Sequence, residues 1–220
     1  MNDLRSLYQL HHDTIIRVRE QFPDEELYGP LLASPTTYFD QPRRLLVIGQ
    51  ETNGWACNHR DLDFQLAYYR DFNVAENYRV SPFWQFVRKI ESIMGIAPCS
   101  CAWTNLNRFD QDHAPPKGEV LAQITRLDFL VREEITVLLP DVCVFFTHKR
   151  HDDRLTALYD GLTFENLSGL PADDFVRLRH PALPANTFRT PHPKSIRLRG
   201  LEQDFSDITA KMLSQSKNDF

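Results

Sequence analysis

An apolar run that stops at a glycine, with an amide and a carboxylate directly after it, constrains the fold of this chain most. The run extends from Leu45 to Gly49 and reads LLVIG, and Gln50 and Glu51 follow it. Parallel strands that are covered on both faces consist of nearly continuous Leu, Val and Ile. Ligands of open α/β sheets bind beyond the carboxyl ends of such strands. We therefore predict a buried strand over residues 44–49 that brings Gln50 and Glu51 to a cleft.

The remaining chain alternates between helical and extended patterns. Apolar spacing, capping residues and prolines predict helices over residues 3–21, 81–95, 119–138, 152–159 and 201–213. Short apolar runs predict strands over residues 102–106, 141–147 and 175–179, and residues 186–190 lead into a last loop. Repeated β-then-α units favour parallel strands joined by right-handed crossovers. We expect one α/β domain over residues 1–220, a three-layer α/β/α sandwich with a short parallel central sheet, whose strand-end loops converge at one rim.

Composition and cysteine spacing limit the class of protein. A chain of 220 residues, 42% of them hydrophobic and 25% charged, suits one globular domain with a sizeable core. No apolar segment approaches the roughly 20 residues that span a bilayer, and the first residues lack the order of a signal peptide. We expect a cytoplasmic monomer without membrane contact. The cysteines include no C-x-x-C pair, so we expect neither a metal nor another cofactor, with Cys143 in the core and free thiols at Cys57, Cys99 and Cys101.

Charge is unevenly distributed along the chain. The formal net charge of -5 argues against a protein that coats nucleic acid through a large excess of Lys and Arg. Residues 189–199 nevertheless contain no acidic residue and carry several basic ones, Arg189, Lys194, Arg197 and Arg199, together with His192. A basic strip on an acidic protein suits one confined anionic contact. The alternative is an ordinary solvated surface.

Three loops at the predicted strand ends carry polar residues in a distinctive order. They are residues 49–53 (GQETN), 103–108 (WTNLNR) and 190–195 (TPHPKS). In order, context and spacing over most of the chain, they resemble the uracil-DNA glycosylase superfamily. Its motifs are a Gly-Gln-Asp-like turn after the first strand, an asparagine at a middle strand end and a His-Pro-Ser-like loop before the final helix. Each motif alone is weak, and the ordered combination is more specific.

The resemblance implies a DNA glycosylase that hydrolyses the N-glycosidic bond of a flipped-out pyrimidine and leaves an abasic site. Glu51 would orient water and stabilise the positively charged sugar, and His192 would donate a hydrogen bond to the base O2 as negative charge collects there. Considered singly, Glu51 is better interpreted as a loop carboxylate that caps a helix, and His192 as a loop histidine hydrogen-bonded to backbone. His180, in a second His-Pro pair, is a rival for the last motif.

The resemblance also assigns residues that bind the base. Asn105 would read the pyrimidine edge, because one amide offers both a donor and an acceptor. Asn107 is a neighbouring candidate for that role. Gln50, Asn53 and Trp55 complete the predicted substrate site. Two further aromatic residues are stacking candidates for which core packing is the favoured alternative, Phe83 and Trp84.

A flipped nucleotide requires contacts that offset the cost of unstacking. The basic strip provides the predicted DNA-binding residues, Lys194, Ser195, Arg197 and Arg199. Ile196 or Leu198 would be the inserted wedge. Lys194 is also a candidate lyase nucleophile, although we favour phosphate contact and monofunctional hydrolysis.

Departures from the family pattern bear on the substrate. Glu51 replaces the usual aspartate, Lys194 replaces a serine, and Thr52 and Asn53 stand where a proline and a tyrosine are usual. In uracil-specific relatives an aromatic residue after the acid blocks substituents at carbon 5, whereas the Asn53-Gly54 pair leaves that side open.

We therefore expect a bulky 5-modified pyrimidine, such as glucosylated 5-hydroxymethylcytosine in phage DNA, as part of antiviral defence. If Trp55 swings into the gap, the enzyme would instead act on uracil in DNA repair. A noncatalytic DNA-binding module is the main alternative from another class. A nucleotide or small-molecule enzyme is discouraged by the absence of G-x-G-x-x-G and P-loop motifs.

Overall fold

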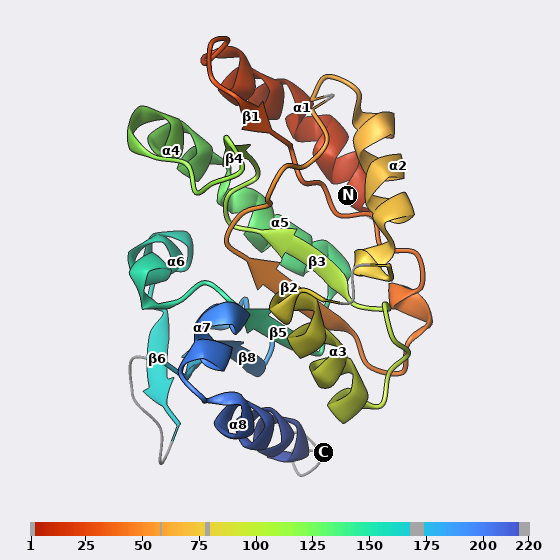
Figure 1. The fold of residues 1–220 in the computed structure, drawn as a ribbon, viewed down its shortest axis with the longest axis vertical. Helices are drawn as coiled ribbons and strands as arrows, with labels where there is room; N and C mark the ends of the chain where they lie inside the picture. The colour runs from red at the N-terminus through yellow and green to blue at the C-terminus, as the bar shows by residue number, and fades with distance from the viewer. Residues whose placement is uncertain (1–2, 58, 78–79, 168–173, 216–220) are drawn as a thin grey trace.

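A six-stranded sheet lies at the centre of the computed structural model, which describes residues 3–57, 59–77, 80–167 and 174–215. The strand order is β3-β2-β5-β8-β7-β6 (Figure 1). The strands are β2 (Leu45–Gly49), β3 (Ala102–Asn105), β5 (Val142–Phe145), β6 (Thr163–Asn166), β7 (Val176–Arg179) and β8 (Asn186–Arg189). A separate two-stranded sheet pairs β1 (Leu27–Tyr28) with β4 (Asp110–Gln111).

The prediction of a parallel sheet holds for part of the sheet, which as a whole is mixed. Strands β3, β2, β5 and β8 are parallel to one another, whereas β7 is antiparallel to both β8 and β6. Parallel neighbours need a crossover of about a dozen residues or more. Residues 180–185 are too few for one, and they form a turn in which the Leu183 N–H donates to the His180 carbonyl.

Helices cover both sides of the sheet (Figure 1). They are α1 (Leu4–Glu20), α2 (Leu62–Phe72), α3 (Pro82–Met94), α4 (Gly118–Ile124), α5 (Phe129–Leu138), α6 (Asp152–Leu158), α7 (Pro193–Leu198) and α8 (Glu202–Gln215). Short 3₁₀ turns are η1 (Tyr38–Asp40), η2 (Asn73–Ala75), η3 (Thr125–Leu127) and η4 (Lys149–His151). Helix α1 packs against α2 and α5, and α3 packs against α7 and α8. The α/β architecture with helices on both faces of a central sheet is thus as expected.

Two differences from the predicted elements have local causes. The helix expected over residues 119–138 is divided at η3, where the Thr125 hydroxyl donates to the carbonyls of Leu121 and Ala122. Such a bond competes with helical geometry and bends the chain. Helix α2 was not predicted, although the Asp61 side chain caps it by accepting from the Phe64 N–H at 2.9 Å.

The register of the parallel strands aligns the loops that carry the candidate site. Gly49 pairs with Asn105, Ile48 with Phe145, and Phe145 in turn with Arg189. Backbone bonds continue beyond the strands, because the Asn107 N–H donates to the Gln50 carbonyl at 2.8 Å. The predicted convergence of the loops after β2, β3 and β8 at one rim is confirmed.

The remaining expectations concern membrane-spanning helices, metal sites and the cysteine thiols. Among the described residues, no helix has the length and apolarity that a bilayer crossing requires. No three His, Cys, Asp or Glu side chains in these same ranges are grouped as a metal site would need. Cys143 is buried in the core as predicted, and Cys57, Cys99 and Cys101 are free thiols.

Candidate functional site

A cavity of about 750 Å³ opens where the loops after β2, β3 and β8 meet. Its walls include the predicted catalytic and substrate-binding residues together with Lys194, namely Gln50, Glu51, Asn53, Trp55, Asn105, His192 and Lys194. Residues of α2, α3 and the segment before α3 close the other side. Pockets of this size hold molecules as large as a typical drug. The fold therefore brings distant sequence motifs to one concave site.

Glu51 lies directly after β2 and is held by a side chain from the loop after β3. Asn107 Nδ2 donates to Glu51 Oε2 at 3.1 Å. Burial raises the pKa of Glu51 above its usual value, and the Asn107 bond and the charges of Arg150 and Arg154 oppose that rise. The carboxylate is thus partly desolvated and partly stabilised by donors.

A polar chain behind Glu51 fixes the orientation of Asn107. Arg154 on α6 donates from Nη1 to Asn107 Oδ1 at 2.8 Å, and it pairs with Asp128 through bonds of 2.9 and 2.5 Å. Because a guanidinium only donates, the amide must turn its oxygen to Arg154 and its N–H to Glu51. Asn107 therefore supports the carboxylate instead of reading a base. The sequence gives no local indication of these hydrogen bonds, because Asn107, Arg154 and Asp128 come from separate elements.

Replacing Asn107 with alanine is expected to raise the pKa of Glu51 further. The desolvation of the carboxylate would remain while the hydrogen bond that favours its charged form would be lost. Carbon-detected NMR titration of the glutamate side chains in both proteins would measure the change. The half-exposed Asn186 provides a matched Asn-to-Ala control, and an unchanged Glu51 titration in the Asn107 variant would contradict the role of this bond.

His192 presents a neutral N–H donor to the cavity. It stands at the N-cap of α7, where Nδ1 accepts from the Lys194 N–H at 3.2 Å. The ring proton of the neutral imidazole must then lie on Nε2. Burial, with the charges of Arg150 and Lys194, lowers the pKa of His192 to about 4, so the ring is neutral near physiological pH.

The rival histidine is placed elsewhere. His180 donates from Nε2 to the Asp160 carbonyl at 3.0 Å, while its Nδ1 accepts from the Ala182 N–H at 3.1 Å. It lines a different, smaller cavity formed by residues 178–181 and 183–185. Of the two candidates, His192 is the one that shares a cavity with Glu51.

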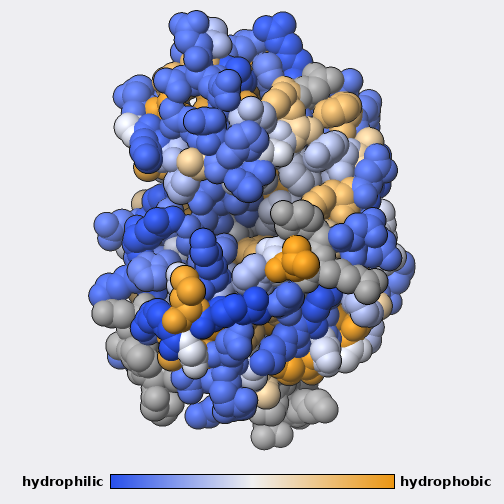
Figure 2. All heavy atoms as spheres, in the orientation of Figure 1, coloured by the Kyte–Doolittle hydropathy of each residue, from blue (hydrophilic) through white to orange (hydrophobic). Residues whose placement is uncertain are grey.

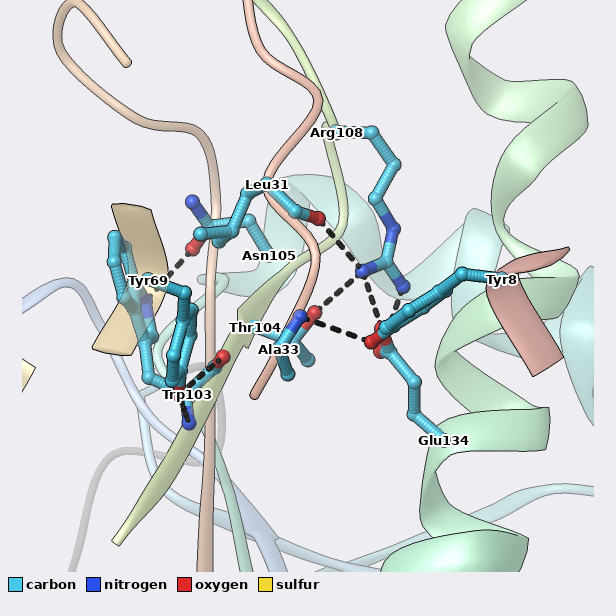
Figure 3. A network of polar contacts seen from close by, with 9 residues as sticks. All are labelled: Tyr8, Leu31, Ala33, Tyr69, Trp103, Thr104, Asn105, Arg108 and Glu134. Atoms are coloured by element: carbon cyan, nitrogen blue, oxygen red, sulfur yellow. Dashed lines mark hydrogen bonds and ion pairs between the residues drawn. The ribbon is translucent and has the colours of Figure 1, made fainter. Parts of the chain in front are cut away.

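Asn105 has an amide donor available at the cavity wall. Trp103 Nε1 donates to Asn105 Oδ1 at 3.1 Å (Figure 3). Asn105 Nδ2 is buried and finds no partner among the described residues. A buried donor left unpaired costs about 1–3 kcal/mol, which a ligand acceptor would recover. Gly49 is required beside it, because a Cβ at that position would collide with Asn105 Oδ1.

Trp55 forms a fixed part of the wall. It is 5% exposed, its Nε1 donates to Gln65 Oε1 at 3.1 Å, and its ring packs edge-on against Tyr68 and Trp103. These contacts oppose the swing that would narrow the site. Gly54 has a φ of +82°, and a Cβ there would collide with the His113 ring, so a larger residue at position 54 would be strained.

The aromatic stacking candidates have different surroundings. Trp84 is buried and packs edge-on against Trp103, which agrees with the core-packing alternative. Phe83 is partly buried and lies 5.9 Å from the His192 ring, measured between centroids. Both side chains also contribute to the cavity wall.

The charges of the basic strip, residues 189–199, are less available to bind DNA than the sequence alone indicates. Arg197 donates to Glu202 at 3.0 Å and to Gln85 at 2.6 Å, and Arg199 pairs with Asp174 through bonds of 2.5 and 2.6 Å. Carboxylates therefore offset both charges. Lys194 is exposed at the cavity, whereas the partly buried Ser195 lies in the first turn of α7.

The two candidates for the inserted wedge differ in their exposure. Ile196 is fully buried in the core and cannot insert into DNA. Leu198 is 77% exposed and remains a candidate. Figure 2 shows a predominantly hydrophilic face with a few separate apolar spots.

The side-chain amide of Gln50 is hydrogen-bonded within the protein. One of its partners is Arg150, which was not predicted as a site residue. Gln50 Nε2 donates to the Phe146 and Thr147 carbonyls, both at 3.3 Å, and Gln50 Oε1 accepts from Arg150 Nη2. Arg150 follows β5, a strand end that the three motifs do not include. The sequence feature that could have indicated Arg150 is its position after a buried apolar strand.

The arrangement can stabilise opposite charges on two parts of one ligand. Glu51 offers negative charge, while His192 and Asn105 offer N–H donors, and all three face the same cavity. Such preorganised groups favour a reaction in which charge separates. Comparison with known proteins adds no family assignment, since no family model matches this chain and no curated protein matches its sequence.

Proposed function

We propose that this protein is a DNA glycosylase that hydrolyses the N-glycosidic bond of a flipped-out pyrimidine and leaves an abasic site. The three loops resemble those of the uracil-DNA glycosylase superfamily. The observation that carries the proposal is that Glu51, Asn105 and His192, each from a different loop, line one cavity. Their chemistry matches the charges that develop when such a bond breaks.

In the proposed reaction, the bond between C1′ and N1 breaks and its electron pair leaves with the base. The sugar becomes positive and is stabilised by the ionised Glu51, which also orients the attacking water. His192 Nε2–H donates to the base O2, where negative charge collects. Water oxygen then bonds to C1′, and the proton that water loses is accepted by Glu51 or passed to the departing base.

The favoured substrate is a pyrimidine with a bulky group at carbon 5, such as glucosylated 5-hydroxymethylcytosine in phage DNA. Three features support this choice: the cavity volume of about 750 Å³, the small Asn53-Gly54 segment, and the bond that holds Trp55 against Gln65. An enzyme with this specificity would act in antiviral defence. Uracil excision in DNA repair is the alternative within the same chemistry.

The test compares base release from oligonucleotides that each contain one candidate base. The purified protein is incubated with DNA bearing uracil, a thymine mismatch or the glucosylated cytosine, and abasic sites are then cut with hot alkali. We expect scission at the glucosylated base. Scission at uracil alone would refute the bulky substrate, and scission before alkali would indicate that Lys194 acts as a lyase nucleophile.

The same assay separates the other classes of function. Binding of every substrate without an abasic product would indicate a noncatalytic DNA-binding module. Cleavage of free nucleosides but not of DNA would indicate a small-molecule enzyme. Either result would refute the glycosylase proposal.

A further inference from the structure

Arg150 is a cation held in place by two neutral acceptors. It belongs to η4, the turn after β5, and its side chain is exposed. Nη2 donates to Gln50 Oε1, and Nε donates to His151 Nε2 at 3.1 Å. Burial, aided by Arg154 and Arg150, lowers the pKa of His151 to about 4, so that the ring is neutral and able to accept. Both contacts orient the guanidinium without offsetting its charge.

The surrounding arginines differ from Arg150 in this respect. Four of them pair with a carboxylate, namely Arg154, Arg189, Arg197 and Arg199. Arg150 forms no ion pair with a carboxylate anywhere in the ranges that the structure describes. No contacting carboxylate in those ranges therefore neutralises its charge, and the carboxylate that it influences from a distance is Glu51 in the cavity.

The Arg150 guanidinium lies close to residues that line the cavity. Gln50, which binds Arg150, lines the cavity, and Arg150 is close enough to Glu51 and His192 to lower the pKa of both. Lys194, exposed on the same wall as His192, also lowers the pKa of that histidine. A concave site with cations on one side attracts anionic ligands.

We propose that Arg150, together with Lys194, binds a phosphate of the DNA strand beside the nucleotide that occupies the cavity. This inference rests on the proposed function. An exposed guanidinium suits the backbone better than the base, because a flipped base enters the pocket while its phosphates stay outside. Arg150 uses one N–H on Gln50 and another on His151, which leaves donors for the paired contact that arginine makes with phosphate.

The proposal is tested by the salt dependence of DNA binding. The probe is a fluorescent duplex that contains a tetrahydrofuran abasic analogue, which binds without turnover, and Kd is measured over a series of KCl concentrations. Arg150→Gln should weaken binding and reduce the slope of log K against log salt by about 0.9, the value for one phosphate contact. Arg150→Lys should restore the slope, with incomplete recovery of affinity because the paired geometry is lost.

Arg179→Gln and Arg5→Gln are the matched controls. Their charges are already offset by Glu165 and Asp63, and neither residue belongs to the basic strip or lines the cavity, so their slopes should equal that of the wild type. Thermal unfolding of each variant shows whether the fold is kept, which the exposed location of Arg150 leads us to expect. An unchanged slope for Arg150→Gln, or an equal reduction in either control, would overturn the proposal.

Binding and base release are measured separately, so the two proposals can fail independently. If the wild type releases no base but the slope changes in Arg150→Gln, the phosphate site stands and the glycosylase proposal falls. If base is released and the slope is unchanged, the reverse holds. A wild-type protein that fails to bind the duplex would refute the phosphate site.

Discussion

Replacing Glu51 with glutamine is expected to slow base release by about 10²- to 10⁴-fold, the range for removal of a positioned acid or base. Glutamine keeps the shape of the side chain but lacks the charge that would stabilise the sugar cation. Single-turnover assays on the substrate that the wild type cleaves would measure the rate. Affinity for the abasic duplex should change little, because the lost interaction strengthens only in the transition state.

The pH dependence of the reaction provides a second readout of the same group. Burial raises the pKa of Glu51, so its charged form requires a higher pH than an ordinary glutamate. The rate should therefore fall as the pH decreases through that raised pKa. Burial lowers the pKa of His192 to about 4, whereas it raises that of Glu51, so we expect Glu51 to lose its charge before His192 gains one as the pH falls.

Two comparisons make this expectation specific. Glu51→Gln should lack the acidic limb that Glu51 causes, and Asn107→Ala should shift that limb to higher pH. Glu165→Gln, at an exposed glutamate on β6, is a suitable control for loss of a carboxylate elsewhere. Wild-type base release by Glu51→Gln would show that the carboxylate has another role.

Replacing Glu134 with alanine is expected to lower the free energy of unfolding by about 3–5 kcal/mol, as is typical when one partner of a buried ion pair is removed. Glu134 on α5 accepts two bonds from Arg108, at 2.7 and 2.8 Å, and one from the Tyr8 hydroxyl (Figure 3). Both charged side chains are fully buried. Without Glu134, the Arg108 charge would remain inside the core uncompensated.

Urea denaturation of graded variants would separate charge from hydrogen bonding. Tyr8→Phe removes the hydroxyl that also accepts from the Ala33 N–H at 2.9 Å, and it should cost about 1–3 kcal/mol for an unsatisfied buried donor. Glu134→Gln should fall between the two, because it keeps an acceptor without the charge. A loss for Glu134→Ala no larger than that for Tyr8→Phe would contradict the importance of the ion pair.

This ion pair also bears on the candidate site. Arg108 donates to Thr104 Oγ1 at 2.6 Å and so ties the end of β3 to the loop that follows it. Asn105 and Asn107 lie between these two anchored residues. Destabilising the ion pair should therefore disturb the residues that face the cavity and support Glu51.

The strand-end residues could be predicted because the relevant information is local. A continuous apolar run identifies a buried parallel strand, and the polar residues after it must lie at the sheet edge. Gln50 and Glu51 were placed by this argument, whereas Asn105 and His192 were assigned through the family resemblance of their loops, and all four line the cavity.

Other features depend on contacts between distant parts of the chain. Arg199 pairs with Asp174, and Arg154 joins Asp128 to Asn107, so sequence charge alone could not show which cations are free. Strand β6 was missed because its residues are mostly exposed and carry no apolar run. The antiparallel hairpin that it forms with β7 was missed for the same reason.

Glu51 and His192, the two proposed reacting groups, follow strands of the same hydrogen-bonded sheet. Glu51 follows β2 and His192 follows β8, and both strands pair with β5 between them. The two strands are therefore separated by two interstrand intervals of about 4.8 Å each, and a change in that separation would break hydrogen bonds of the sheet. Under the proposed function, we therefore expect the bound nucleic acid to undergo the larger change of shape when a target nucleotide reaches Glu51 and His192.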